Sequence, residues 1–119
     1  MIPLILVLLS FAWGHNDDEV LMSGYDLSAT RNFKSEIDID NVNSLLIKWN
    51  VTLCGSPFGT PLVREGQVCT GDLGGCYTCI DDDTGAIIFQ KNITLDYGLP
   101  GNAFVRVTPT YEDGKVIMA

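Results

Sequence analysis

The sequence predicts an all-β fold that makes up about one to one and a half blades of a β-propeller. Its 119 residues include 12 Gly and 5 Pro, which separate short apolar stretches; this pattern is typical of strands joined by tight turns. The chain also repeats itself without gaps, because residues 59–71 match residues 107–119. A repeat of roughly 40 to 50 residues built from short strands indicates propeller blades, each of which is one four-stranded sheet.

Each copy of the repeat is predicted to begin with a hairpin. Four identities carry the alignment, at Thr60, Pro61, Gly66 and Val68, which recur as Thr108, Pro109, Gly114 and Val116. The two glycines stand where a short turn needs a residue that tolerates positive φ. We therefore expect residues 107–119 to begin a second blade.

The first copy is predicted to continue into a complete blade over residues 59–106. Its strands are expected at Leu62–Val63, Gln67–Thr70, Cys76–Ile80 and Ala86–Lys91. Asp81–Gly85 lies where the last turn is needed, and Asp and Gly are residues that turns use. An EF-hand calcium loop that began at Asp81 would need Gly at its sixth position and Glu at its twelfth, where this chain has Ala86 and Asn92. The sequence therefore favours a turn over a calcium site.

Residues 1–14 have the pattern of a signal peptide. The uncharged stretch Ile2–Trp13 is shorter than the roughly 20 residues that a bilayer requires. It has the length of a signal-peptide core, and Ala12 and Gly14 supply small residues at a cleavage site. We expect a secreted chain in which residues 15–44 form an N-terminal extension and lead-in segment. The alternative is a buried strand or helix at the start of a cytosolic domain.

The cysteine content also fits a secreted chain. Four cysteines form an even number, which favours disulfides over a metal site; they are Cys54, Cys69, Cys76 and Cys79. Cys76 and Cys79 are expected on opposite faces of one strand, so they should not pair with each other. If the preceding turn centres on Asp72-Leu73, Cys69 lies opposite Cys76. We therefore favour Cys69–Cys76 with Cys54–Cys79 among the three possible pairings, the alternative being four buried free thiols.

The surface chemistry limits the partners. Asn50 and Asn92 each begin an Asn-x-Thr glycosylation sequon, which agrees with secretion. The net charge is −8, and an acidic surface repels both nucleic acid and anionic membranes. No segment of the sequence has the length and apolar character of a membrane span. We therefore expect neither nucleic acid nor a membrane span among the interactions of this chain.

Four stretches follow one another in a characteristic order, and they are Gly24–Phe33, Asp40–Trp49, Thr60-Pro61 and Thr84-Gly85. Together they resemble the N-terminal region of quinoprotein dehydrogenases, most closely the polyvinyl-alcohol-dehydrogenase-like branch. That family begins with a Gly-Asp-x-x-x-x-Arg segment and an Asn-Val-x-x-Leu-x-x-x-Trp strand. Repeats that read roughly Thr-Pro, Gly-x-Val and Thr-Gly follow. The resemblance extends from about Gly24 to Ala119.

The resemblance implies the N-terminal portion of a PQQ-type eight-bladed β-propeller. In this family pyrroloquinoline quinone binds on the propeller axis with a calcium ion, and a small-molecule alcohol or polyol is oxidised by hydride transfer to the quinone. Residues 45–51 are then expected to form a strand that closes the ring by joining the last blade, so that the partial propeller covers residues 45–119. The isolated chain is expected to be inactive, because no closed axial pocket can form.

The resemblance carries one cofactor residue into this chain. Arg106, just before Thr108, occupies the position of an Arg that contacts the quinone, although pairing with a surface carboxylate is the alternative. Phe58 stands where the family has a Glu, and Pro100-Gly101 where it has adjacent cysteines. The metal ligands and the catalytic base would lie beyond residue 119, so we assign no catalytic or metal-binding residue here. Asp26 and Arg31 are interpreted as residues that hold a turn, as an ion pair.

Two functions are compatible with these residues. The first is a fragment of a secreted quinoprotein-like alcohol dehydrogenase, favoured by the resemblance and by Arg106. The second is a non-catalytic secreted β-propeller that binds or scaffolds a partner, favoured by Phe58 and by the missing cysteine pair. Since one fold hosts many functions, the residues of the site have to decide between them.

Overall fold

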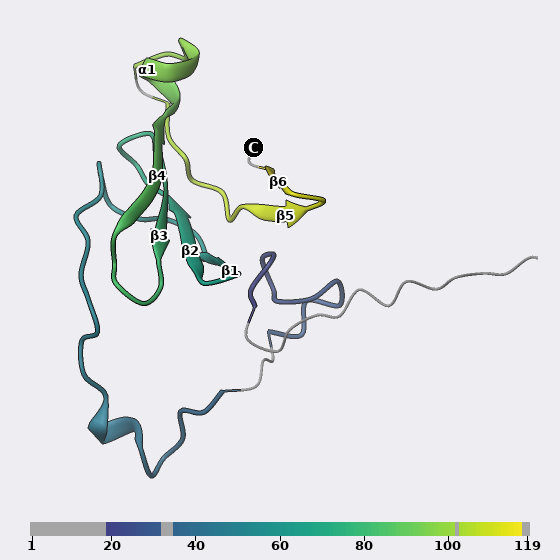
Figure 1. Cartoon of the computed structure of the whole chain (residues 1–119). Helices are drawn as coiled ribbons and strands as arrows, with labels where there is room; N and C mark the ends of the chain where they lie inside the picture. Colours follow the sequence, from purple (N-terminus) through teal and green to yellow (C-terminus); the bar gives the residue numbers. More distant parts are fainter. Residues whose placement is uncertain (1–18, 32–34, 102, 118–119) are drawn as a thin grey trace, which may run out of the picture.

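The computed structural model describes residues 19–31, 35–101 and 103–117 (Figure 1). The predicted signal peptide lies outside these ranges. The regular secondary structure of the described part is mostly β-strand, and its only helical elements are η1 (Val42–Ser44) and α1 (Ile93–Tyr97). The all-β class is therefore confirmed. No helix in the described ranges has the length and apolar character needed to cross a membrane.

Four strands form one antiparallel sheet in chain order, and they are β1 (Leu62–Arg64), β2 (Gln67–Gly71), β3 (Cys76–Asp81) and β4 (Ile87–Asn92). Each strand lies within one residue of the bounds predicted from the sequence. The prediction succeeds because the strands are apolar or β-branched and the turns between them carry Gly and Asp, which are local signals. Two further strands, β5 (Thr110–Glu112) and β6 (Lys115–Ile117), form a separate hairpin.

The two copies of the repeat fold into hairpins with the same turn. In the first, Glu65 and Gly66 have φ of 47° and 74°; in the second, Asp113 and Gly114 have φ of 47° and 75°. Two successive residues with positive φ make the type I′ turn, whose twist matches that of antiparallel strands. The predicted hairpin of the second copy is therefore confirmed.

The turn between β3 and β4 is also as predicted. The Asp81 carboxylate accepts hydrogen bonds from the hydroxyl and the backbone N–H of Thr84, both at 2.7 Å. These bonds, the hydroxyl first, lower the pKa of the Asp81 carboxyl. Gly85 closes the turn with φ of 73°. This carboxylate therefore serves the backbone of its own turn.

The N-terminal segment ties the sheet to the second hairpin. Val20 exchanges two backbone hydrogen bonds of 2.8 Å with Val63 of β1, and Leu21 accepts one of 3.0 Å from Tyr111 of β5. In Figure 1 this segment, in purple, lies between β1 and β5. Edge strands leave unpaired backbone groups, and residues 20 and 21 satisfy some of these groups on both edges at once.

The core lies on the face of the sheet that the second hairpin approaches. It consists of buried apolar side chains, with Ile93 and Tyr111 at its rim, and its members are Leu62, Cys69, Tyr77, Cys79 and Val105. Val105 packs directly on the backbone of Gly71. A glycine is needed there because no side chain fits between β2 and the chain segment that crosses it.

Residues 45–51 belong to neither sheet. Trp49 anchors this segment, because its indole N–H donates a 2.7 Å hydrogen bond to the carbonyl of Asp82. Lys48 adds an exposed ion pair with Asp83 at 2.8 Å. The closing strand expected here would have to pair with a blade outside this sequence, so that role stays a prediction.

The contact at Gly71 gives a direct test of the packing. A Cβ at this position would lie 2.6 Å from the Val105 carbonyl oxygen and closer still to the Val105 side chain. We expect Gly71→Ala to lower the free energy of unfolding by about 1–3 kcal/mol, as overpacked cores do. Gly101→Ala is the matched control, since nothing lies within 4 Å of a Cβ there. Urea denaturation of both variants measures the difference, and equal stability would contradict the described packing.

Candidate functional site

Arg106 stacks on the residue that occupies the same place in the first repeat. Its guanidinium carbon lies 5.5 Å from the centre of the Phe58 ring, within the range of a cation–π contact. Next to this pair, the backbone N–H of Thr60 donates a 2.9 Å hydrogen bond to the Thr108 hydroxyl. The starts of the two repeats therefore lie side by side and contact each other through equivalent positions.

The environment of Arg106 bears on its predicted role. Within the described ranges no carboxylate forms an ion pair with this guanidinium. The alternative prediction, that Arg106 pairs with a surface carboxylate, is therefore not seen in the described ranges. Contact of Arg106 with a quinone stays a prediction.

The four cysteines form two disulfides, but not the favoured pairs. The bonds join Cys54 to Cys76 and Cys69 to Cys79, so the predicted Cys69–Cys76 and Cys54–Cys79 pairing is wrong. Cys69 lies opposite Cys79 because β2 extends to Gly71, which pairs with Tyr77. The turn is therefore centred on Gly74 and not on Asp72-Leu73. The expectation that Cys76 and Cys79 do not pair with each other is confirmed.

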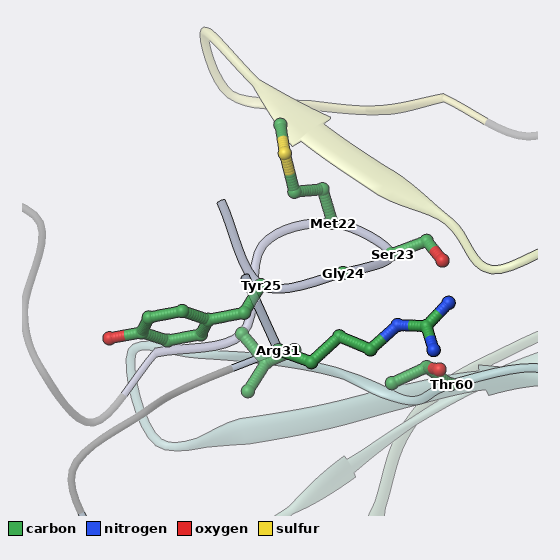
Figure 2. Close-up of a pocket in the computed structure, with 7 residues that line it drawn as sticks. Met22, Ser23, Gly24, Tyr25, Arg31 and Thr60 are labelled. Atoms are coloured by element: carbon green, nitrogen blue, oxygen red, sulfur yellow. The ribbon is translucent and has the colours of Figure 1, made fainter. Parts of the chain in front are cut away.

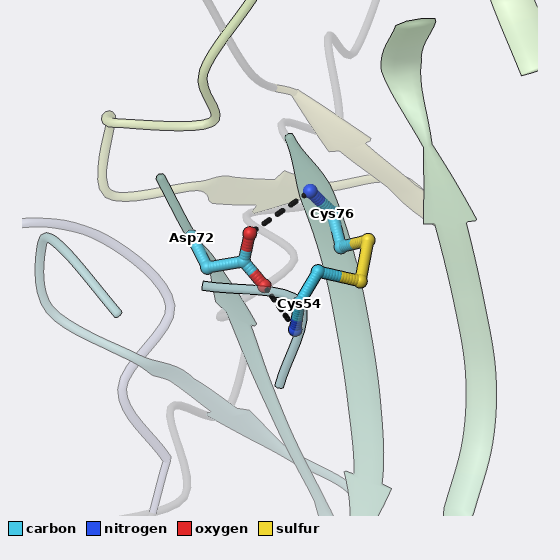
Figure 3. Close-up of side chains that lie close together, drawn as sticks. All are labelled: Cys54, Asp72 and Cys76. Atoms are coloured by element: carbon cyan, nitrogen blue, oxygen red, sulfur yellow. Dashed lines mark hydrogen bonds between the residues drawn. A yellow bond between two sulfur atoms is a disulfide. The ribbon is translucent and has the colours of Figure 1, made fainter. Parts of the chain in front are cut away.

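Asp72 fixes the position of this turn. Its carboxylate accepts hydrogen bonds from the backbone N–H groups of Gly74 at 2.8 Å, Cys76 at 3.0 Å and Cys54 at 3.1 Å. Figure 3 shows the Asp72 carboxylate beside the two cysteines, with hydrogen bonds to the backbone nitrogens of Cys54 and Cys76. Asp72 is only 1% exposed, and a buried carboxylate needs such donors.

Cys54, Asp72 and Cys76 bring three potential metal-ligating atoms within 4.8 Å of one another. The chemistry of the group argues against a metal, because thiolates are the ligands that metals take and both sulfurs are bonded to each other. The Asp72 oxygens are already engaged by three backbone N–H groups. The cluster is therefore a structural joint between the segment before β1, which carries Cys54, and the sheet.

A pocket of about 310 Å³ lies between the N-terminal segment and the start of β1 (Figure 2). The described residues of its lining combine apolar and polar side chains with one charged group, and they are Val20, Met22, Ser23, Gly24, Tyr25, Arg31 and Thr60. No sequence pattern indicates this pocket, because Thr60 and the N-terminal residues meet only in the folded chain.

Hydrogen bonds within residues 22–31 hold the wall of this pocket. The Asp26 carboxylate accepts from the Thr30 backbone N–H at 3.0 Å and from the Thr30 hydroxyl at 2.7 Å. The Arg31 N–H donates to the Gly24 carbonyl at 2.9 Å. The predicted Asp26–Arg31 ion pair is therefore wrong, since Asp26 is bound to Thr30 and Arg31 lines the pocket.

A second hollow, of about 320 Å³, separates the sheet from β6, with Tyr77, Phe89 and Val116 among its lining residues. The Tyr77 hydroxyl is buried here and has no hydrogen-bond partner in the described part of the chain. Burial raises the pKa of Tyr77 to about 12, because the phenolate is harder to desolvate than the phenol.

The two sequons have different surroundings. Asn50 is exposed. Asn92 is the N-cap of α1, where its side-chain oxygen accepts from the N–H groups of Thr94 and Leu95 at 3.0 and 3.1 Å. Helix α1 was not predicted from the sequence, although an Asn N-cap and a Gly C-cap at Gly98 are recognised helix signals. Glycosylation of either residue stays a prediction.

No protein-family model matches this sequence, and none of the curated proteins compared with it is significantly similar. The resemblance to quinoprotein dehydrogenases therefore depends on the quoted motifs alone.

Loss of the Asp72 carboxylate should be costly. In Asp72→Ala three backbone donors lose their acceptor in a buried site, so we expect the free energy of unfolding to fall by about 3 kcal/mol or more. Asp72→Asn, which keeps one amide oxygen, should lie between this variant and the wild type. Asp83→Ala is the control, because it removes only an exposed ion pair. The measurements are urea denaturation and non-reducing peptide mapping, and wild-type stability of Asp72→Ala would refute the role of this carboxylate.

The buried Tyr77 hydroxyl predicts a loss of stability in alkali. The unfolded chain deprotonates this group near pH 10, whereas the folded chain keeps the proton up to about pH 12. Stability should therefore fall as the pH rises from about 10 to about 12. Tyr77→Phe should reduce this fall and raise stability at neutral pH by roughly 1 kcal/mol. Tyr97→Phe, at an exposed tyrosine, should change neither, and a lower stability of Tyr77→Phe would show that the hydroxyl has a partner.

Proposed function

We propose that this chain is part of a secreted β-propeller that binds a ligand or partner and does not oxidise alcohols with pyrroloquinoline quinone. The observation that carries this proposal is the pair formed by Phe58 and Arg106. In the quinoprotein scheme a Glu would stand at the position of Phe58. Here an aromatic ring occupies that place and contacts the one cofactor residue that is retained.

The fit of the described residues to the cofactor is incomplete. A guanidinium such as that of Arg106 suits the carboxylates of the quinone, because it offers a planar fork of donors. Phe58 has no carboxylate with which to accept hydrogen bonds or bind calcium. Pro100-Gly101 cannot form the disulfide that adjacent cysteines make in the quinoprotein family. We therefore derive no reaction step through the quinone for this chain.

The propeller part of the proposal is supported by the repeat. Both copies begin with the same type I′ hairpin, and their starts touch at Thr60 and Thr108. The hollow between the sheet and β6 is the place where further strands of a second blade would pack. The buried Tyr77 hydroxyl at this hollow has no hydrogen-bond partner among the described residues and would then find an acceptor, as buried polar groups in native proteins do.

Secretion is supported by the two disulfides. Disulfides form and persist in oxidising compartments and are rare in the cytosol. The predicted signal peptide and the exposed sequon at Asn50 agree with this location.

A quinoprotein dehydrogenase remains the second candidate, and Arg106 favours it. The guanidinium is exposed and is not paired with any carboxylate in the described ranges. It can therefore meet an anionic ligand without breaking an existing ion pair.

Calorimetric titration with pyrroloquinoline quinone in the presence of calcium distinguishes the two candidates. We expect no saturable binding by the wild type and no change in Arg106→Ala. Lys115→Ala serves as a control for the loss of an exposed positive charge. Saturable binding that is weakened in Arg106→Ala but not in Lys115→Ala would overturn the proposal and support the dehydrogenase.

A further inference from the structure

We propose that the pocket between residues 20–31 and the start of β1 binds a small organic carboxylate with an apolar body. Such a carboxylate would be the ligand of the binding module proposed above, so its assignment rests on that proposed function.

The polar end of the pocket holds a set of donors suited to a carboxylate. In Figure 2 the Arg31 side chain runs along the pocket and points toward the side on which Ser23 and Thr60 are drawn. A guanidinium and a carboxylate form two parallel hydrogen bonds, a geometry that an ammonium group cannot reproduce. The hydroxyls can donate to the same oxygens.

The charge of the pocket points to an anion. The chain carries a net charge of −8, yet among the described residues that line this pocket Arg31 is the only charged one, and none of them is an Asp or Glu. Within the described ranges the Arg31 guanidinium has no ion-pair or hydrogen-bond partner. Asp26, the nearest acidic residue in sequence, is bound to Thr30. An acidic protein therefore presents an uncompensated positive group at a concave site.

The remaining walls are apolar and define the body of the ligand. Val20 lines the pocket, and in Figure 2 Met22 and the ring of Tyr25 lie away from the guanidinium. Its volume of about 310 Å³ lies at the lower end of the range for small-molecule pockets. One aromatic ring that bears a carboxylate matches this size and this division into apolar and polar ends.

The backbone around the pocket is fixed in an unusual shape. Tyr25 and Arg31 have φ of 77° and 55°, a region that residues with a side chain rarely adopt. Such residues are kept where the surrounding structure holds them, and they cluster at binding sites. Here the Arg31–Gly24 hydrogen bond and the pairing of Val20 with Val63 hold them. The backbone at Tyr25 and Arg31 is therefore held in one conformation in the closed segment, so less backbone freedom is lost when a ligand binds.

Titration of the chain, with both disulfides formed, with benzoate tests this inference. Benzamide serves as the uncharged analogue, and inorganic phosphate serves as an anion without an apolar body. We expect saturable binding of benzoate and at least about tenfold weaker binding of the other two. Arg31→Gln should weaken benzoate binding about tenfold or more, whereas Arg31→Lys should recover part of it. Arg106→Ala should bind benzoate like the wild type.

Each result has one meaning. Equal binding of benzamide, or unchanged binding in Arg31→Gln, would overturn the carboxylate site and leave Arg31 as a solvated side chain. Phosphate that binds as tightly as benzoate would replace it with a general anion site. Circular dichroism checks that Arg31→Gln folds, and Thr60→Val, which keeps the shape of its side chain, should weaken benzoate independently. Quinone binding that depends on Arg106 would refute the proposed function, and benzoate binding that depends on Arg31 can be measured separately from it.

Discussion

The hydrogen bonds of the Asp72 carboxylate set the geometry on which the rest of the sheet depends. Three backbone N–H groups from two distant parts of the chain converge on this buried side chain. They place the turn between β2 and β3, and the turn sets the register in which Cys69 faces Cys79. The same bonds bring Cys54 next to Cys76. The Asp72 carbonyl also accepts the N–H of Val105 at 3.0 Å, so the segment that leads to the second repeat is fixed at the same residue.

The N-terminal segment joins the two copies of the repeat through backbone hydrogen bonds. The four-stranded sheet and the β5–β6 hairpin each expose unpaired backbone groups at their edges, and short sheets of this kind do not by themselves join. Residues 20 and 21 bond to an edge of each sheet, and the side chain of Arg64 adds a contact by lying 3.5 Å above the centre of the Tyr111 ring. Residues 22–25 and Arg31, which follow these contacts in the chain, line the pocket.

The strands and the hairpins could be predicted from the sequence because their signals are local. Gly66 and Gly114 mark the turns, and the apolar residues beside them mark the strands. The disulfide pairing could not be predicted, because the pattern of strand residues does not locate the turn centre, which the Asp72 carboxylate sets through its bonds to Gly74 and Cys76. Helix α1 was not predicted because Asn92 was interpreted only as the start of a glycosylation sequon, although the same residue is the N-cap of the helix. The pocket was missed because an Asp26–Arg31 pair is the simplest expectation for two opposite charges in one turn, whereas Thr30 satisfies that carboxylate.

The pairing of Val20 and Leu21 with strands far along the chain also has a kinetic consequence. Strands β1 to β4 are joined by short turns, so they can form through local contacts, whereas the N-terminal pairing must close long loops and wait for β5. Contacts between residues distant in sequence carry the larger loop-closure cost and form late. The N-terminal closure is therefore expected to be the last step of folding and the first to open, and faster amide exchange at Tyr111 than at Val68 would reveal this order. A ligand beside Arg31 would bind to the least stable unit of the molecule and hold it shut.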